Sequence, residues 1–439
     1  MRKFKAQPAR GISGVIAVPG DKSISHRALM VSGIAQGLSE VTGFLASEDC
    51  LASLAAMRAL GVTIEQPSPS HVVIHGVGLH GLRDAGHALD MGNAGTAMRL
   101  FTGLLSAQSF SSQLIGDVSL MQRPMERVAK PLREMGADIR TRNGKPPVDI
   151  GGGRRLHGIE YRMPVASAQV KSAILLAALY GDTSTTVIAP NINRDHSERM
   201  LARCGVRLDI DGLRTTLHAP KQLTNQRIDV PGDFSSAAFF IVAGLLGAAP
   251  AGLLIRNVGL NPTRTGLLDV LRAMGGAIEI LNPRDSGAEP VADLLVRASA
   301  LRGVEVPVET VPLAIDELPV LFIAAACATG ETLVVGAAEL RVKESDRIAA
   351  MSAGLESLGV AHDVLSDGMR IEGRGDGAAF SGGEVDSFGD HRIAMSFAMA
   401  SLRAAKSIVI RDVANVATSF PGFVGLARSV GLDVCESAG

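Results

Sequence analysis

Apolar and polar positions along the chain repeat one pattern six times. In each copy an amphipathic stretch ends at a glycine, and a segment that alternates apolar and polar residues follows. The six glycines are Gly61, Gly136, Gly205, Gly275, Gly359 and Gly431. A helix closed by a left-handed glycine and followed by a strand produces this pattern. The sequence therefore predicts six helix–strand pairs at intervals of roughly 70 residues.

A second helix precedes each amphipathic one, and its residues are apolar on nearly all sides. The six segments are 22–34, 95–107, 167–180, 234–246, 316–328 and 392–402. Because they lack a polar face, we expect each to be a buried central helix. The predicted unit is strand, buried helix, strand, amphipathic helix, strand. Six copies in order along 439 residues indicate a repeat architecture.

The motif Pro-Gly-Asp-X-Ser occurs twice, at 19–23 and 231–235, and three repeats separate the copies. Six units of this size suggest two domains of three units each. We interpret the two motifs as the points where the chain passes between domains. One domain is predicted over 20–232, and the other combines 1–19 with 233–439. The functional site is expected in the cleft between them.

Composition narrows the class of protein. Aromatic residues make up 3% of a chain that is 46% hydrophobic, so the core must be largely aliphatic. The formal net charge of −1 gives no general attraction to nucleic acid or anionic membranes. No segment predicts a membrane span or a secretory signal. The four dispersed cysteines predict reduced thiols and no metal site. We therefore expect a cytoplasmic protein, monomeric by default.

Basic residues collect where helices are predicted to begin. Lys22, Arg123, Lys343 and Arg392 stand at such positions, and Pro124 is expected at the first helical position. A helix N-terminus already carries partial positive charge, so a cation there is unfavourable for the helix itself. A bound anion resolves the conflict, because it accepts hydrogen bonds from the free N–H groups and from the cations. The sequence predicts an anion site built from several repeats.

Plainer explanations exist for single members of this set. Four side chains are expected to act as helix N-caps: Ser23, Ser167, Asp316 and Asp390. Glu344 and Arg347 could form a surface ion pair three residues apart. His26 and His391 are as easily structural as functional. The joint pattern outweighs these alternatives, because equivalent helix starts rarely acquire cations by chance.

At these positions the chain resembles the 5-enolpyruvylshikimate-3-phosphate (EPSP) synthase family of enolpyruvyl transferases. The matching segments run in order along nearly the whole chain: 19–30, 92–100, 120–125, 167–179, 231–240, 316–321, 341–348, 390–395 and 418–423. The resemblance implies an α/β fold, a two-domain inside-out α/β barrel of six βαβαββ repeats, three per domain, with parallel buried helices. It also implies that the enolpyruvyl group of phosphoenolpyruvate is transferred to the 5-hydroxyl of shikimate 3-phosphate. Phosphate leaves, and no metal or organic cofactor takes part in this step of the shikimate pathway.

The resemblance also assigns roles to residues that match the family's motifs. Shikimate 3-phosphate would be held by Lys22, Ser23, Arg27, Ser167, Gln169 and the backbone of Ala168. Phosphoenolpyruvate would be clamped by Asn93, Gly95, Arg123, Arg347 and Arg392, with help from Lys22 and Lys343. Asp316 would take the proton of the 5-hydroxyl, and Glu344, assisted by Lys22, would protonate the methylene carbon. The chemistry needs two carboxyl groups, because one proton is removed while another is delivered.

Three other interpretations compete with this one. The related transferase acting on UDP-N-acetylglucosamine usually carries a cysteine in a catalytic loop, and segment 116–124 has none. RNA 3′-terminal phosphate cyclase shares part of the architecture, but the neutral charge disfavours RNA binding. A non-catalytic anion-binding repeat protein could lose Asp316 and Glu344, and this chain has both.

Several positions depart from many family members. Leu100 stands where many relatives have proline, while Ala168 and Thr418 resemble a divergent bacterial branch that includes glyphosate-tolerant members. Gly95 is the small residue associated with glyphosate sensitivity. Because a methyl group there would crowd the inhibitor, we expect Gly95→Ala to raise tolerance.

Overall fold

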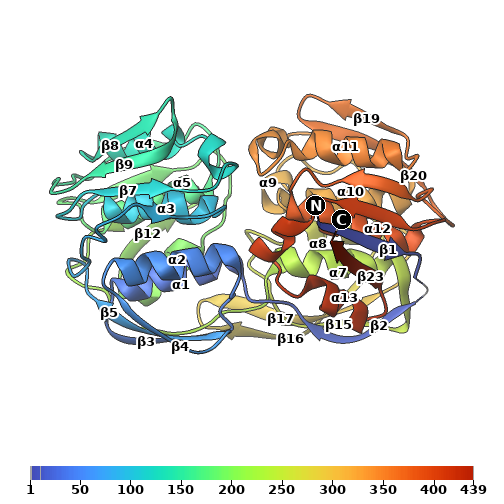
Figure 1. Cartoon of the computed structure of the whole chain (residues 1–439), viewed down its shortest axis with the longest axis horizontal. Coiled ribbons are helices and arrows are strands. Elements are labelled where there is room, and N and C mark those ends of the chain that lie inside the picture. The colour runs from blue at the N-terminus through green and yellow to red at the C-terminus, as the bar shows by residue number, and fades with distance from the viewer. Residues whose placement is uncertain (1, 10, 439) are drawn as a thin grey trace. The chain divides into compact units, whose positions relative to one another are not determined.

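The computed structural model describes residues 2–9 and 11–438, which fall into two compact units (Figure 1). Unit 1 comprises the described residues within 1–19, 231–285 and 290–439, and unit 2 comprises 20–230 and 286–289. The second boundary lies two residues before the predicted one. The short segment 286–289 is an addition that the sequence pattern did not indicate.

Unit 2 contains three four-stranded sheets of one design. In each, the first two strands are parallel and the next two pairings are antiparallel. The first sheet has the order β14 (Arg227–Asp229), β3 (Gln36–Thr42), β5 (His71–Val77), β4 (Thr63–Ser68). The second is β6 (Leu89–Asp90), β7 (Ser112–Ile115), β9 (Lys145–Gly151), β8 (Asp138–Arg142), and the third is β10 (Glu160–Arg162), β11 (Thr185–Ile188), β13 (Arg214–His218), β12 (Arg207–Asp211).

Unit 1 repeats this design with three sheets of its own. They are β2 (Ile12–Ala17), β15 (Ala248–Gly259), β17 (Glu289–Arg297), β16 (Ala277–Ser286); β18 (Thr329–Val334), β20 (Gly368–Arg374), β19 (His362–Leu365); and β21 (Gly383–Asp386), β22 (Ile408–Arg411), β1 (Arg2–Gln7), β23 (Asp433–Ala438). In the three-stranded sheet, parallel bridges from Arg302 and Glu305 to β18 take the place of the first strand. The described repeat thus has one strand more than the unit that the periodicity predicts, and it has the four strands of the βαβαββ repeat that the resemblance implies.

The six predicted buried helices are confirmed. They are α1 (Lys22–Gly33), α3 (Gly95–Leu105), α5 (Ala168–Ala178), α7 (Phe234–Gly247), α10 (Leu318–Cys327) and α12 (His391–Ala400). Each is followed by a half-buried helix that ends before one of the six glycines: α2 (Glu48–Ala59), α4 (Glu126–Glu134), α6 (His196–Arg203), α8 (Gly266–Ala273), α11 (Arg347–Ser357) and α13 (Phe423–Ser429). The φ angles of those glycines lie between +78° and +101°, the conformation that the pattern required. One further short helix is α9 (Val311–Ala314).

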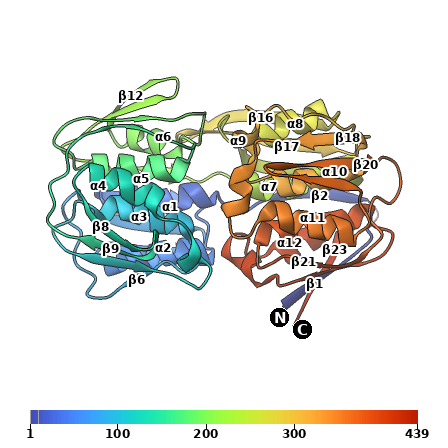
Figure 2. The same ribbon diagram turned by 90° about the horizontal axis from the view of Figure 1, so that it is seen from above.

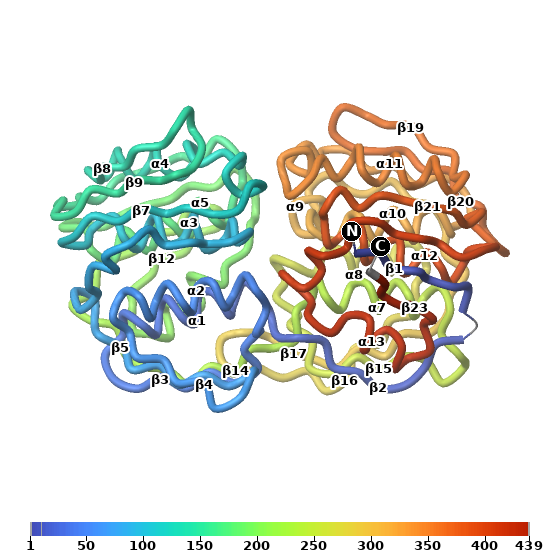
Figure 3. The backbone as a smooth tube through the Cα atoms, in the orientation of Figure 1, coloured from blue at the N-terminus to red at the C-terminus, as the bar shows by residue number. Residues whose placement is uncertain are grey.

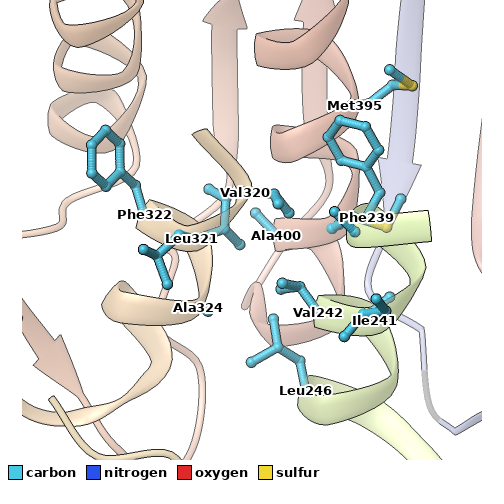
Figure 4. Close-up of a cluster of buried hydrophobic side chains, with 14 of the residues drawn as sticks. Phe239, Ile241, Val242, Leu246, Val320, Leu321, Phe322, Ala324, Met395 and Ala400 are labelled. Carbon is cyan, nitrogen blue, oxygen red and sulfur yellow. The ribbon is translucent and has the colours of Figure 1, made fainter. Parts of the chain in front are cut away.

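The buried helices form the core of each unit. In unit 1, α7, α10 and α12 contact one another, and Phe239, Leu321 and Met395 lie among the side chains of the apolar cluster in Figure 4. In unit 2, α3 contacts both α1 and α5, and Figure 2 shows these helices alongside each other. Burying one such large apolar side chain contributes about 1.5–3 kcal/mol, so the helices are held by packing. Their N-terminal residues are therefore fixed to a rigid core.

Two strands are exchanged at the points where the chain passes between units. Strand β2 precedes α1 in the sequence, yet it pairs with β15, which follows α7. Strand β14 precedes α7, yet it pairs with β3, which follows α1. Each unit therefore completes one sheet with a strand that the sequence order assigns to the other. Gly20 follows the first exchanged strand, and a Cβ there would lie 1.8 Å from the carbonyl oxygen of Gly43, so only glycine fits.

The two ends of the chain meet within unit 1. Strand β1 lies between β22 and β23 and pairs with both in antiparallel register, and Figure 3 shows the termini side by side. No helix of the described residues is long and apolar enough to cross a membrane. The four cysteines are free thiols; Cys435 is exposed and the others, Cys50, Cys204 and Cys327, are buried.

Candidate active site

The start of α1 places Lys22 beside a carboxylate. Asp21 caps the helix and accepts a hydrogen bond from the Ile24 N–H at 2.9 Å, so Ser23, the predicted cap, lies inside the first turn. The Lys22 ammonium lies 2.9 Å from Oδ2 of Asp49 on α2. This ion pair orients the lysine at the N-terminus of a buried helix, where an anion is favoured.

Arg27 is held by contacts from three helices. Its side chain is almost fully buried. Its Nε donates to Ser197 Oγ on α6, and its Nη2 donates to Ser172 Oγ on α5, both at 2.7 Å. Its Nη1 donates to the carbonyl oxygen of Ser23 at 2.9 Å. These oxygens fix the plane of the guanidinium without adding negative charge, which suits the binding of a phosphate.

The start of α5 carries the predicted Ser-Ala-Gln sequence. Ser167 is the N-cap, as predicted, and accepts from the Val170 N–H at 3.4 Å. Ala168 is the first helical residue. The Gln169 side chain donates to Thr96 Oγ1 at 2.9 Å and accepts a hydrogen bond from Arg99. Gln169 therefore ties the starts of α5 and α3 together.

Arg123 lies over the start of α3. Its Nη2 donates to Asn93 Oδ1 at 2.8 Å, and the Asn93 amide donates to Asp117 at 2.7 Å. A Cβ added to Gly95 would come within 2.8 Å of Arg123 Nη1. The lack of a side chain at Gly95 thus makes room for the guanidinium. The predicted helix start is wrong here, because α4 is capped by Met125 and Pro124 lies before the cap.

We treat the predicted residues of unit 2 as one group, because contacts of Arg27 and Gln169 join the helices that carry them. The group contains Lys22, Ser23, Arg27, Asn93, Gly95, Arg123, Ser167, Ala168 and Gln169, at or beside the N-termini of α1, α3 and α5. Lys171 of α5 and Glu198 of α6 form a buried ion pair near the starts of these two helices. The cations and free N–H groups of these helix ends suit a phosphate or carboxylate ligand.

In unit 1, Asp316 is surrounded by cations. Its Oδ1 lies 3.3 Å from Arg347 Nη1 and 3.5 Å from Lys343 Nζ, and its Oδ2 lies 3.9 Å from Arg392 Nη2. The prediction that Asp316 caps α10 is wrong. Asp316 stands one residue before the N-cap Glu317, because the chain first forms the short helix α9.

Arg347 is the most buried cation of this cluster, with a side chain 1% exposed. Its Nη2 donates to Glu344 Oε2 at 2.6 Å and its Nε to Asp390 Oδ2 at 2.8 Å. Burial opposes its charge, but Asp390, Glu344 and Asp316 outweigh burial and raise the pKa of Arg347. Burial likewise disfavours the Asp390 carboxylate, yet Arg347 holds the pKa of Asp390 below its usual value. The pair Glu344–Arg347 is therefore part of a buried network and not surface decoration.

Arg392 and Lys343 complete the unit 1 cluster. Arg392 is the second residue of α12, and its backbone N–H donates to the cap Asp390 at 2.9 Å. Its Nη1 donates to the carbonyl oxygen of Asp316 at 2.9 Å. Lys343 does not begin a helix, contrary to the prediction, because it follows a 3₁₀ turn at 338–342 and α11 begins four residues later. The cluster can bind an anion and also offers carboxylates for proton transfer.

Several residues of the two clusters escaped sequence reasoning. Ser172 and Ser197 orient Arg27, and Asp49 pairs with Lys22. These partners are separated from the cations by 27 to 170 positions. Nothing in the local pattern links them, although Ser172 lies in the same motif as Gln169. The described residues contain no group of three or more His, Cys, Asp or Glu side chains that could hold a metal ion.

Known proteins resemble this chain along its whole length. A family model described as EPSP synthase (3-phosphoshikimate 1-carboxyvinyltransferase) matches residues 6–426. A 3-phosphoshikimate 1-carboxyvinyltransferase of Methylococcus capsulatus is 56% identical over 432 residues, which are 98% of each chain. The structure of an EPSP synthase from Acinetobacter baumannii has a TM-score of 0.90 at 50% identity and covers 100% of both chains. The enolpyruvyl transferase NikO from Streptomyces tendae, at 18% identity, a TM-score of 0.79 and coverage of 100% of this chain and 99% of its own, shares the fold alone.

Proposed function

The chain belongs to the EPSP synthase family and has its activity, that of a 3-phosphoshikimate 1-carboxyvinyltransferase of the shikimate pathway, and we propose how its residues carry out that reaction. The enolpyruvyl group of phosphoenolpyruvate is transferred to the 5-hydroxyl of shikimate 3-phosphate. The hydroxyl oxygen bonds to the carbon that bears the phosphate, and the methylene carbon takes up a proton and becomes a methyl group. Phosphate then leaves, the methyl group loses a proton, and the double bond forms again.

The unit 2 group holds shikimate 3-phosphate in this proposal. Lys22, Ser23 and Arg27 bind it from α1, and Ser167, Gln169 and the backbone of Ala168 bind it from the start of α5. Arg27 supports this assignment best, because its guanidinium is buried and oriented by serine oxygens. A planar guanidinium fixed in this way presents its N–H donors as a rigid fork, a geometry that matches the oxygens of a phosphate.

Phosphoenolpyruvate is bound by the remaining predicted residues of both units. Asn93, Gly95 and Arg123 contribute from unit 2, and Lys343, Arg347 and Arg392 contribute from unit 1, with Lys22 shared between both substrates. The ligand carries a carboxylate and a phosphate, and arginine pairs with each in a bidentate manner. In this proposal each unit is an inside-out α/β barrel of parallel buried helices. Exclusion of water from the bound substrates would strengthen every charge interaction.

The observation that carries the proposal is the surroundings of Asp316. This carboxylate lies within 4 Å of cations from three separate segments, which are Lys343, Arg347 and Arg392. We assign Asp316 as the base that takes the 5-hydroxyl proton. Glu344, assisted by Lys22, is the acid that protonates the methylene carbon. Two carboxyl groups with different partners suit opposite proton transfers.

We further propose that the enzyme acts in the cytoplasm as a monomer without a metal or organic cofactor. Its partners are the two small-molecule substrates, with no nucleic acid and no membrane. The acid–base groups and cations described above supply the chemistry that the reaction needs.

The test is an assay of phosphate release with both substrates, for wild type and for Asp316→Ala. Wild type is expected to release phosphate only when phosphoenolpyruvate and shikimate 3-phosphate are both present. Loss of a general base lowers kcat by about 10²–10⁴-fold, so the variant should lose nearly all turnover. Full activity of the variant would refute the role of Asp316. Release of phosphate without shikimate 3-phosphate would refute the proposed reaction.

A further inference from the structure

A second buried carboxylate stands beside Asp316 and has no role in the assignments above. Glu317 is the N-cap residue of α10, and its side chain is 1% exposed. Its Oε1 accepts a hydrogen bond from Ser235 Oγ on α7. No described residue hydrogen-bonds its Oε2, which is also buried. An ionised carboxylate in such a place is costly unless cations compensate it, so its neighbours are informative.

Two arginines compensate Glu317. Arg392 Nη1 lies 3.7 Å from its Oε1, and Arg264 Nη2 lies 4.0 Å from the same atom. One oxygen of Glu317 therefore lies near both arginines. Arg392 is proposed to bind phosphoenolpyruvate, whereas Arg264 is assigned to neither substrate. Figure 1 shows α7, α10 and α12, which carry Ser235, Glu317 and Arg392, in the core of unit 1.

Arg264 anchors this arrangement to the points where the chain enters and leaves unit 1. It is 3% exposed and donates to Ser235 Oγ at 2.6 Å and to Asp233 Oδ1 at 3.3 Å. Asp233 caps α7, and its backbone N–H donates to the carbonyl oxygen of Pro19 at 2.8 Å. A continuous series of contacts therefore begins at Pro19 and Asp233, where the chain passes between the units. It continues through Arg264 and Glu317 and ends at Arg392.

Arg392 is oriented by its contacts with the start of α10. Its Nη1 donates to the carbonyl oxygen of Asp316 at 2.9 Å and faces Glu317 Oε1. These two oxygens fix one end of the planar guanidinium. A guanidinium whose plane is fixed loses less freedom when it binds a carboxylate or phosphate in a bidentate manner.

We propose that Glu317 is a positioning residue for phosphoenolpyruvate: it holds the guanidinium of Arg392 in its binding orientation, and Ser235 and Arg264 hold Glu317 in turn. The proposal rests on the proposed function of Arg392 as a ligand of this substrate. Glu317 itself is not expected to touch either substrate.

The test compares steady-state kinetics of Glu317→Gln with those of wild type. The amide keeps the shape but removes the charge that holds Arg392, so the KM for phosphoenolpyruvate should rise by about tenfold, since charged hydrogen bonds are the strong ones. The KM for shikimate 3-phosphate should stay within about twofold, because no described contact of the Glu317 side chain involves the unit 2 residues that bind this substrate in the proposal. Glu317→Asp keeps the charge and should restore part of the loss.

A matched control removes an exposed carboxylate of the same unit. Glu331 on β18 lies 3.6 Å from Arg370, and both side chains are about half exposed. Glu331→Gln is expected to leave both KM values and kcat unchanged, because exposed ion pairs contribute little.

The outcomes separate this inference from the proposed function. If wild type shows the two-substrate reaction and Glu317→Gln leaves the KM for phosphoenolpyruvate unchanged, or raises both KM values equally, Glu317 has no positioning role. If wild type fails to catalyse the reaction, the proposed function fails first. Should Glu317→Gln not fold, Ser235→Ala decides, because it removes only the hydroxyl that holds Glu317. A rise of about threefold in the KM for phosphoenolpyruvate alone supports the proposal, and an unchanged value overturns it.

Discussion

The two units use equivalent helix starts but surround their arginines differently. In unit 2, Arg27 donates to serine hydroxyls, and Arg123 donates to the amide oxygen of Asn93. In unit 1, Arg347 donates to the carboxylates of Asp390 and Glu344. Neutral oxygens orient a guanidinium and leave its charge for a ligand, whereas carboxylates cancel that charge but can exchange protons. The same repeat therefore surrounds its arginines with neutral oxygens in unit 2 and with carboxylates in unit 1.

The difference is one of degree, because lysines of unit 2 also pair with acids. Lys22 lies beside Asp49, and Lys171 beside Glu198. Lysine is a compact charge on a flexible stem, whereas the planar fork of arginine is oriented by its partners. The two units therefore differ most clearly in the partners of their arginines.

The largest effect is expected from removing the charge of Arg27. In Arg27→Gln the KM for shikimate 3-phosphate should rise by about 10²-fold, since a buried, charge-assisted contact to phosphate is lost. The KM for phosphoenolpyruvate should change far less. The measurement is steady-state kinetics with each substrate varied in turn. Arg154→Gln is the control, because Arg154 is exposed and pairs with Asp138 in the same unit. Equal rises in both KM values would show that unit 2 does not discriminate between the substrates.

Acid should weaken unit 2 before unit 1. His26 is buried in α1, and burial together with Lys22 and Arg27 lowers its pKa from 6.5 to about 3. Between these values the unfolded chain binds a proton that the folded chain does not, so stability falls as pH drops below 6.5. The loss amounts to about 2 kcal/mol at pH 5. Asp390 in unit 1 has a lowered pKa as well, but its contribution persists until pH falls below the ordinary range of a carboxyl group.

Hydrogen exchange measured at pH 7 and pH 5 tests this order. Amides of α1 and α3 are expected to lose protection at pH 5, while those of α10 and α12 keep theirs. His26→Asn is the control, because its amide can replace the hydrogen bond between His26 Nδ1 and Ser53 but cannot titrate. Equal loss of protection in both units, or an unchanged pH response in the variant, would contradict the assignment to His26.

The smallest effect is expected from Gly95→Ala. The new methyl group would lie 2.8 Å from Arg123 Nη1, and this flexible end must shift. We expect the KM for phosphoenolpyruvate to rise by about threefold to tenfold and tolerance to glyphosate to increase. Gly425→Ala is the control, because no atom lies within 4 Å of the added group. An unchanged inhibition constant would show that Arg123 does not restrict this position.

The sequence alone determined the repeat and the chemical class of the site. Hydrophobic periodicity and helix-ending glycines are local properties, so six buried helices and six left-handed glycines could be predicted without a structure. Cations at helix starts likewise indicated an anion site. The predicted helix starts were wrong at Pro124, Lys343 and Asp316, because a turn precedes each helix and the helix begins later in the chain.

Only the tertiary structure decided which partner each cation has. Arg27 meets a serine 170 positions away, and Arg347 meets Asp390 43 positions away. The exchange of β2 and β14 also follows from sheet pairing and not from the order of elements. A pattern of residues records which face of a helix is buried, because burial depends on local spacing. It does not record which distant side chain meets that face, since that depends on how all the helices pack together.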